Sequence, residues 1–189
     1  MASKRNTIST AKPQNTWEPS RAATSAAPNM HVEKSEGGCG SVMNANALID
    51  TGAILALLDR SDRWHAICTQ TFHQLRLPLL TSEAVLTELF HLVGDSRHKT
   101  AAAWKFVRSG ALATAAIEHA ELPHLQELMS RYSDHPRYSH QPMDFADATL
   151  VHLAKRESLA TIFTVDYRDF EAYRIQGRRR FRVLPSARP

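Results

Sequence analysis

The chain has 189 residues, of which 43% are hydrophobic, enough for one domain of ordinary size with a real core. No stretch of about 18 apolar residues occurs, so the sequence predicts no transmembrane helix. The formal net charge of +4 is compatible with a polyanionic partner but is no strong nucleic-acid signature. Two cysteines, Cys39 and Cys68, are too few for a disulfide framework or a zinc site, and they fit a reducing, cytoplasmic location.

Residues 1–42 are expected to form a disordered tail. They are rich in Ser, Thr, Ala, Asn, Pro and Gly and show no apolar periodicity. They lack the apolar core of a secretory signal, and Glu18, Glu33 and Glu36 argue against a transit peptide. Met43 is an alternative start for a domain spanning residues 43–189, so the tail is expected to be dispensable.

From residue 45 onward the hydrophobic pattern predicts strands that alternate with helices. Strands are expected at 45–49, 79–81, 111–117, 159–165 and 181–184. Helices are expected at 53–59, 63–75, 83–93, 96–109, 121–132 and 144–156, with helical turns at 168–174 and a loop at 133–142. Thr51–Gly52 is expected to turn the chain into the first helix, and Ser61–Asp62 to cap the second. The alternation indicates an α/β fold, with a parallel-rich sheet covered by helices on both faces.

Four acidic residues occupy positions where burial would make an ionised carboxylate costly. Asp50 closes the apolar run Ala47–Ile49, and Asp166 follows another apolar run. An acid at the carboxyl end of a buried parallel strand points into the crevice where open α/β sheets bind ligands. Glu88 and Asp147 each interrupt the apolar side of a predicted helix, where an acid is costly unless it is paired or binds a metal. If the four meet, their mutual repulsion favours a divalent cation, and oxygen-only ligation favours Mg²⁺ or Mn²⁺.

Each acid also has a purely structural interpretation. Asp50 can be a turn residue or a helix cap, and Asp166 can be an Asx-turn residue after its strand. Asp147 can be an ordinary first-turn residue, and Glu88 can pair with a nearby Lys or Arg. Asp144 lies three residues before Asp147 on the same helical face, and either adds to the metal site or caps the helix.

The densest basic run is Arg178, Arg179 and Arg180, which with Arg182 precedes the last predicted strand. It is either a solvated loop or a contact for RNA phosphates, because a phosphate contact needs only positive charge near the backbone.

Four segments, in order and at suitable spacing, resemble the motifs of the PIN domain family. They are Leu48–Asp59 (LIDTGAILALLD), Thr81–Leu89 (TSEAVLTEL), Met143–Val151 (MDFADATLV) and Phe163–Phe170 (FTVDYRDF). The resemblance covers about residues 45–185 and is closest to the toxin nucleases of VapC type. It identifies Asp50, Glu88, Asp147 and Asp166 as the four acids of the family and implies a three-layer α/β/α domain.

The resemblance further implies a metal-dependent ribonuclease, the toxin of a type II toxin–antitoxin pair. The four acids would hold Mg²⁺ or Mn²⁺, and Thr51 and Thr164 would help to hold the acids or a water. A small antitoxin and a second copy of the chain are the implied partners. Surplus apolar residues on the helices at 83–93 and 96–109, including Phe90, Trp104 and Phe106, also favour a homodimer.

Two alternatives remain open. One is a PIN fold without activity that binds RNA or acts as a scaffold. The other is a Mg²⁺-dependent phosphohydrolase of haloacid-dehalogenase type, which also begins with an Asp at a strand end. That class needs a second Asp two residues later, where this chain has Gly52.

Overall fold

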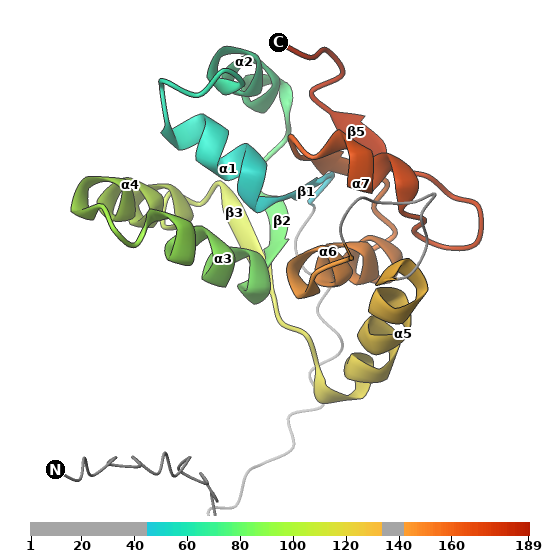
Figure 1. Ribbon diagram of the computed structural model, residues 1–189. Helices are drawn as coiled ribbons and strands as arrows, with labels where there is room; N and C mark the ends of the chain where they lie inside the picture. Colours follow the sequence, from blue (N-terminus) through green and yellow to red (C-terminus); the bar gives the residue numbers. More distant parts are fainter. Residues whose placement is uncertain (1–44, 134–141) are drawn as a thin grey trace, which may run out of the picture. The chain divides into compact units, whose positions relative to one another are not determined.

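The computed structural model describes residues 45–133 and 142–189. The tail predicted at 1–42, the alternative start at Met43 and most of the loop predicted at 133–142 lie outside the described residues. Within them, five strands form one parallel sheet: β1 (Leu48–Ile49), β2 (Leu79–Ser82), β3 (Leu112–Ala115), β4 (Thr161–Phe163) and β5 (Arg182–Leu184). Their order across the sheet is β3-β2-β1-β4-β5 (Figure 1).

Helices connect the successive strands. Helices α1 (Thr51–Leu58) and α2 (His65–Gln74) join β1 to β2, and α3 (Glu83–Val93) and α4 (Arg97–Val107) join β2 to β3. The 3₁₀ helix η1 (His119–Glu121), α5 (Leu122–Ser133) and α6 (Phe145–Arg156) precede β4, and α7 (Tyr167–Ala172) precedes β5. Because parallel crossovers are right-handed, α1–α4 cover one face and α5–α7 the other (Figure 1). The predicted three-layer α/β/α domain is confirmed. No helix in the described ranges is long and apolar enough to cross a membrane.

The chain changes direction across the sheet between β1 and β4. From β1 it proceeds to β2 and β3 on one side, and from β4 it proceeds to β5 on the other. Leu48 in β1 pairs with both Leu80 and Ile162, so β1 lies at the centre. Ligands of such sheets bind beside this switch point, at the carboxyl ends of the strands. Asp50 and Asp166 follow β1 and β4 at this edge.

The central strands are buried on both faces. Leu48, Ile49, Leu80, Ile162 and Phe163 are all fully buried. Unbroken apolar runs of this kind are typical of parallel strands covered by helices on both sides. Each such side chain contributes about 1.5–3 kcal/mol by burial, so the strands give the residues that follow them a rigid base.

The first helix begins earlier than predicted. The Asp50 carboxylate accepts a hydrogen bond from Thr51 N at 2.6 Å and caps α1, so Thr51–Gly52 is the first turn of the helix rather than a separate turn. Glycine is needed there because a Cβ at Gly52 would lie 2.7 Å from Val165 Cγ2.

The second helix begins later than predicted, at His65. Its N-cap is Trp64, which makes no capping bond through its side chain. The Asp62 carboxylate instead accepts from Trp64 N at 2.7 Å. This bond forms an Asx turn before the helix and does not cap it.

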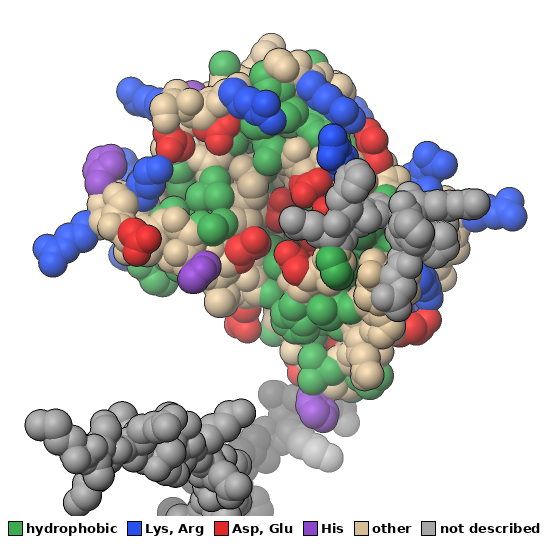
Figure 2. All heavy atoms as spheres, viewed as in Figure 1, with side chains coloured by type: hydrophobic (Ala, Val, Ile, Leu, Met, Phe, Trp, Pro, Cys, Tyr) green, Lys and Arg blue, Asp and Glu red, His purple; other side chains and the backbone are tan. Residues whose placement is uncertain are grey.

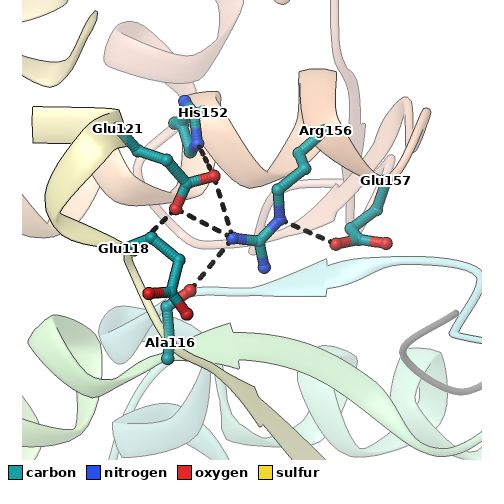
Figure 3. A network of polar contacts seen from close by, with 6 residues as sticks. All are labelled: Ala116, Glu118, Glu121, His152, Arg156 and Glu157. Carbon is teal, nitrogen blue, oxygen red and sulfur yellow. Dashed lines mark hydrogen bonds and ion pairs between the residues drawn. The ribbon is translucent and has the colours of Figure 1, made fainter. Parts of the chain in front are cut away.

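A polar network fixes the carboxyl-terminal half of α6 against η1 (Figure 3). Glu121 accepts from Arg156 Nη1 at 3.1 Å and from Glu118 N at 2.7 Å, and its Oε1 lies 2.8 Å from His152 Nε2. Arg156 Nη1 also donates to Ala116 O at 3.0 Å. Burial opposes ionisation of Glu121, but its bonds outweigh burial and lower its pKa to about 2. The network therefore holds in place the helix whose first turn carries Asp147.

Candidate active site

The four predicted acids reach one cavity at the carboxyl edge of the sheet. Its volume is about 280 Å³. Its acidic lining comprises Asp50, Glu88, Asp144, Asp147, Asp166 and Asp169. In the described part of the chain, no Lys, Arg or His lines it. Figure 2 shows Asp and Glu side chains gathered on this face, among α3, α6 and α7.

Asp50 lies at the centre of the hydrogen bonds and is only 8% exposed. Its Oδ1 accepts from Thr51 N at 2.6 Å, and its Oδ2 accepts from Thr164 Oγ1 at 2.8 Å. The Thr164 oxygen in turn accepts from Asp166 N at 2.9 Å. One buried hydroxyl therefore connects the acid after β1 to the acid after β4.

Thr51 makes the corresponding connection to α3. Its Oγ1 donates to Glu88 Oε2 at 2.7 Å, while its backbone N–H is bound to Asp50. Both threonines that were expected to hold the acids therefore contact them directly. The alternative interpretation of Glu88, a pair with Lys or Arg, does not occur in the described residues, where Thr51 is its hydrogen-bond partner.

A buried hydroxyl pair sets the position of α3 relative to α6. Ser82 caps α3 by accepting from Val85 N at 3.2 Å, and its Oγ lies 2.7 Å from Thr149 Oγ1 in α6. Because Thr149 Oγ1 donates to Ala146 O at 2.6 Å, Ser82 is the donor in the pair. The helices that carry Glu88 and Asp147 are thus joined at the residue where α3 begins.

Asp147 is held by a tyrosine that the sequence did not indicate. Tyr173 is fully buried, and its hydroxyl donates to Asp147 Oδ2 at 2.9 Å. Its ring packs edge-on against Phe170 and Tyr132, at centroid distances of 5.3 and 4.9 Å. Asp144 caps α6 by accepting from Asp147 N at 2.8 Å and also lines the cavity, so both of its proposed roles are compatible with the structure.

Asp169 is a further acid of the cavity that the sequence reasoning missed. It lies in the first turn of α7, where its N–H donates to Asp166 Oδ1 at 3.3 Å. Asp166 therefore caps α7, as Asp144 caps α6. The repeated spacing of two acids three residues apart, Asp144 with Asp147 and Asp166 with Asp169, was a signal that could have identified it.

Enclosure makes ionisation of these acids costly. Burial raises the pKa of Asp50 from 3.8 to about 6, against the bonds from Thr164 and Thr51, and the Glu88 charge raises it further. Burial also raises the pKa of Asp147, and the Asp50 and Asp144 charges raise it further. Carboxylates that share a cavity oppose each other's ionisation, so a cation would relieve both effects.

The donor set fits a hard cation that keeps part of its water. Within residues 45–133 and 142–189, no three Asp, Glu, His or Cys side chains are placed as a ready-made metal site. The acids instead hold hydrogen bonds from Thr51, Thr164 and Tyr173. Mg²⁺ commonly binds through one or two carboxylates and retains several waters, so a complete protein cage is not required.

The structure does not bring the basic run together with the acids. Arg178, Arg179 and Arg180 are exposed and precede β5, whereas the cavity lies beyond the carboxyl ends of the strands. Arg179 Nη2 donates to Ser158 O at 3.3 Å, just before β4 begins. The run therefore lies at the amino edge of the sheet, and its contact with RNA phosphate stays a prediction.

Comparison with known proteins agrees with this architecture. The model of the PIN domain family matches residues 47–176. Ribonuclease VapC26 of Mycobacterium tuberculosis (strain ATCC 25618 / H37Rv) is 31% identical, over 73% of this chain and 99% of the relative. The crystal structure of M. tuberculosis VapC20, a sarcin–ricin loop cleaving toxin, has a TM-score of 0.55 at 18% identity, over 64% of this chain and 90% of that chain. The latter likeness shows the fold. The chain therefore belongs to the PIN domain family, and within it resembles the VapC type.

Proposed function

We propose that this protein is a metal-dependent endoribonuclease of VapC type, which hydrolyses RNA phosphodiester bonds as the toxin of a type II toxin–antitoxin pair. The observation that carries the proposal is the convergence of Asp50, Glu88, Asp147 and Asp166 on one cavity without a basic side chain among its described lining residues. The 31% identity to a ribonuclease over nearly the whole length of that relative supports it.

The four acids would hold Mg²⁺ or Mn²⁺. Such an ion, when bound, lowers the pKa of a water and neutralises charge on the phosphate. The residues of this chain orient the acids: Thr164 and Thr51 fix Asp50, Thr51 fixes Glu88, and Tyr173 fixes Asp147. Hydrolysis by water needs no side-chain nucleophile, and the hydroxyls of Thr51 and Thr164 are already committed to these bonds.

We further propose that the protein works as a cytoplasmic homodimer with a small antitoxin as its partner. Leu92 on α3 and Trp104 on α4 are 55% and 51% exposed. Large apolar side chains that remain exposed in the single chain favour an interface that covers them. Phe90 packs against Trp104 with ring centroids 4.3 Å apart, so α3 contributes to the apolar surface around Trp104. Phe106, also expected at the interface, packs instead against Phe72 at 5.7 Å and adjoins the core. Sedimentation that shows only monomer at micromolar concentration would contradict the dimer.

The phosphohydrolase alternative is disfavoured by space as well as by sequence. It needs an Asp at position 52, where even a Cβ would lie 2.7 Å from Val165 Cγ2 and 3.5 Å from Asp50 Oδ2. The glycine leaves no room for a second acid on this turn.

Cleavage of total RNA by the full chain with Mg²⁺ or Mn²⁺, and with a chelator as control, tests the proposal. Asp50→Asn should abolish cleavage and leave the circular dichroism spectrum unchanged, because Asn keeps the shape and the cap but loses the charge. Asp95→Asn, at an exposed acid outside the cavity, should cleave as wild type does. Undiminished cleavage by a folded Asp50→Asn protein would refute the site. Absence of cleavage by wild type under all conditions would favour the PIN fold that only binds RNA or acts as a scaffold.

A further inference from the structure

A second, larger cavity adjoins the acidic one. Its volume is about 640 Å³, and it lies between the outer face of α3 and the first turn of α6. The α3 wall consists of Glu83, Ala84, Thr87, Glu88 and His91, and the α6 side of Asp144, Phe145 and Ala146. Glu88 and Asp144 line both cavities, so the two are contiguous.

The walls suit a flat aromatic ring. Phe145 is 46% exposed at the first position of α6, although it is a large apolar side chain. Ala84, Thr87 and His91 follow each other at spacings of three and four residues and therefore share one face of α3. Ala84 and Thr87 are small, which leaves space beside the phenyl ring. Of the large apolar side chains exposed in the described ranges, only Phe145 lines this cavity.

The polar groups around this ring are mainly acceptors. The Glu83 carboxylate makes no hydrogen bond or ion pair with any residue that the structure describes. Asp144 uses Oδ1 to cap α6, and Thr87 Oγ1 is committed to Glu83 O at 2.8 Å. Among the described residues no Lys or Arg lines the cavity, and His91 is the only lining side chain that could carry positive charge toward a phosphate. Carboxylates accept well from the amino groups of nucleobases, which uracil lacks.

We propose that this Phe145 cavity binds a nucleobase next to the scissile phosphate and selects bases that carry an amino group over uracil. The inference rests on the proposed ribonuclease function. Because Glu88 and Asp144 line both cavities, the Phe145 cavity would receive a nucleotide of the RNA next to the cleaved bond. Single-stranded RNA is read by stacking its splayed bases on aromatic side chains and by hydrogen bonds to their edges. The base stacks on Phe145, and Glu83 and Asp144 accept from its amino group.

The test is cleavage of a randomised single-stranded RNA pool by the full chain with Mg²⁺, followed by sequencing of the cut ends. Wild type should show depletion of uracil at one position beside the cut. Phe145→Ala should lose this depletion and raise KM about tenfold with kcat little changed, because a base–aromatic stack is removed. Phe145→Trp should keep both properties. Glu83→Gln, which adds a donor, should restore cleavage next to uracil.

Leu122→Ala is the matched control, since Leu122 is also exposed and apolar but lies on α5, outside the cavity. It should behave as wild type, and an equal loss there would overturn the inference. Identical cut-end frequencies and KM in wild type and Phe145→Ala would overturn it and leave the ribonuclease function standing. Conversion of a dimer to a monomer by Phe145→Ala would assign the cavity to a second copy of the chain, and also overturn it.

A binding experiment separates this inference from the ribonuclease proposal. It measures, in the presence of a chelator, how tightly the same RNA pool binds to Asp50→Asn and to the double variant that also carries Phe145→Ala. If wild type cleaves no RNA, the proposed function fails, and weaker binding of the double variant would still support a base-binding cavity. Unchanged binding of the double variant would overturn it.

Discussion

Replacing Asp147 with Asn should stabilise the protein when no divalent cation is present, although it should abolish cleavage. Burial, then the charges of Asp50 and Asp144, raises the pKa of Asp147 above its ordinary 3.8. An acid with a raised pKa binds more protons in the folded than in the unfolded state, so the free energy of unfolding falls as pH rises from 3.8 toward the raised pKa. Asn does not ionise, yet it still accepts the bond from the Tyr173 hydroxyl.

The magnitude follows from the pH interval. At pH 7 the solution is about three pH units above the ordinary pKa, and each unit corresponds to about 1.4 kcal/mol, which gives an upper limit of about 4 kcal/mol. Asp147 is partly accessible to water and shares the effect with Asp50, so we expect about 2 kcal/mol. For a chain of this size, such a gain raises Tm by about 4–8 °C.

Thermal unfolding at pH 5 and pH 8 in a chelator measures this gain. The advantage of Asp147→Asn over wild type should grow from pH 5 to pH 8, and Mg²⁺ should raise the Tm of wild type but hardly that of the variant. Asp95→Asn, at an exposed acid, should change Tm little at either pH. A variant no more stable than wild type at pH 8, or a gain independent of pH, would refute the reasoning.

Three further outcomes are expected. Thr164→Val keeps its shape but removes the donor to Asp50, so the free energy of unfolding, measured in urea, should fall by about 1.5–3 kcal/mol; no change would mean that the bond is dispensable. Asp144→Asn retains a good helix cap and should keep far more RNA cleavage than Asp147→Asn; equal losses would show that both acids serve the reaction directly. Glu121→Gln should lower the free energy of unfolding at pH 7 by about 2 kcal/mol, because the lowered pKa of Glu121 stabilises the fold above pH 4.5. Wild type loses this stabilisation as pH falls from 4.5 through 2, and the variant should not show that loss. Glu127→Gln, in an exposed pair, is the control and should change stability little.

Local features of the sequence were sufficient to predict the fold class and to single out four acids that line one cavity in the structure. Unbroken apolar runs identified the buried strands, and helical periodicity identified the helices between them, because both depend on a few consecutive residues. Asp50 and Asp166 could be recognised since an acid that directly follows a buried strand must lie at the edge of the sheet. Their interpretation as helix caps was correct, and the same two residues also line the cavity, while their role in binding a metal stays a prediction.

The family resemblance indicated that Thr51 and Thr164 help to hold the acids, but only the tertiary structure decided which acid each one contacts and that Tyr173 joins them. Thr164 and Asp50 are separated by 114 positions, and their bond exists because β1 and β4 are neighbours in the sheet. The bond of Tyr173 to Asp147 depends on where α7 ends relative to α6, and the hydrophobic pattern of the sequence does not predict that placement. The direction of β5 likewise determined that the basic run at 178–180 lies at the opposite edge. Sequence patterns determine elements locally, whereas contacts between elements depend on strand order and direction, which are set by packing the whole core.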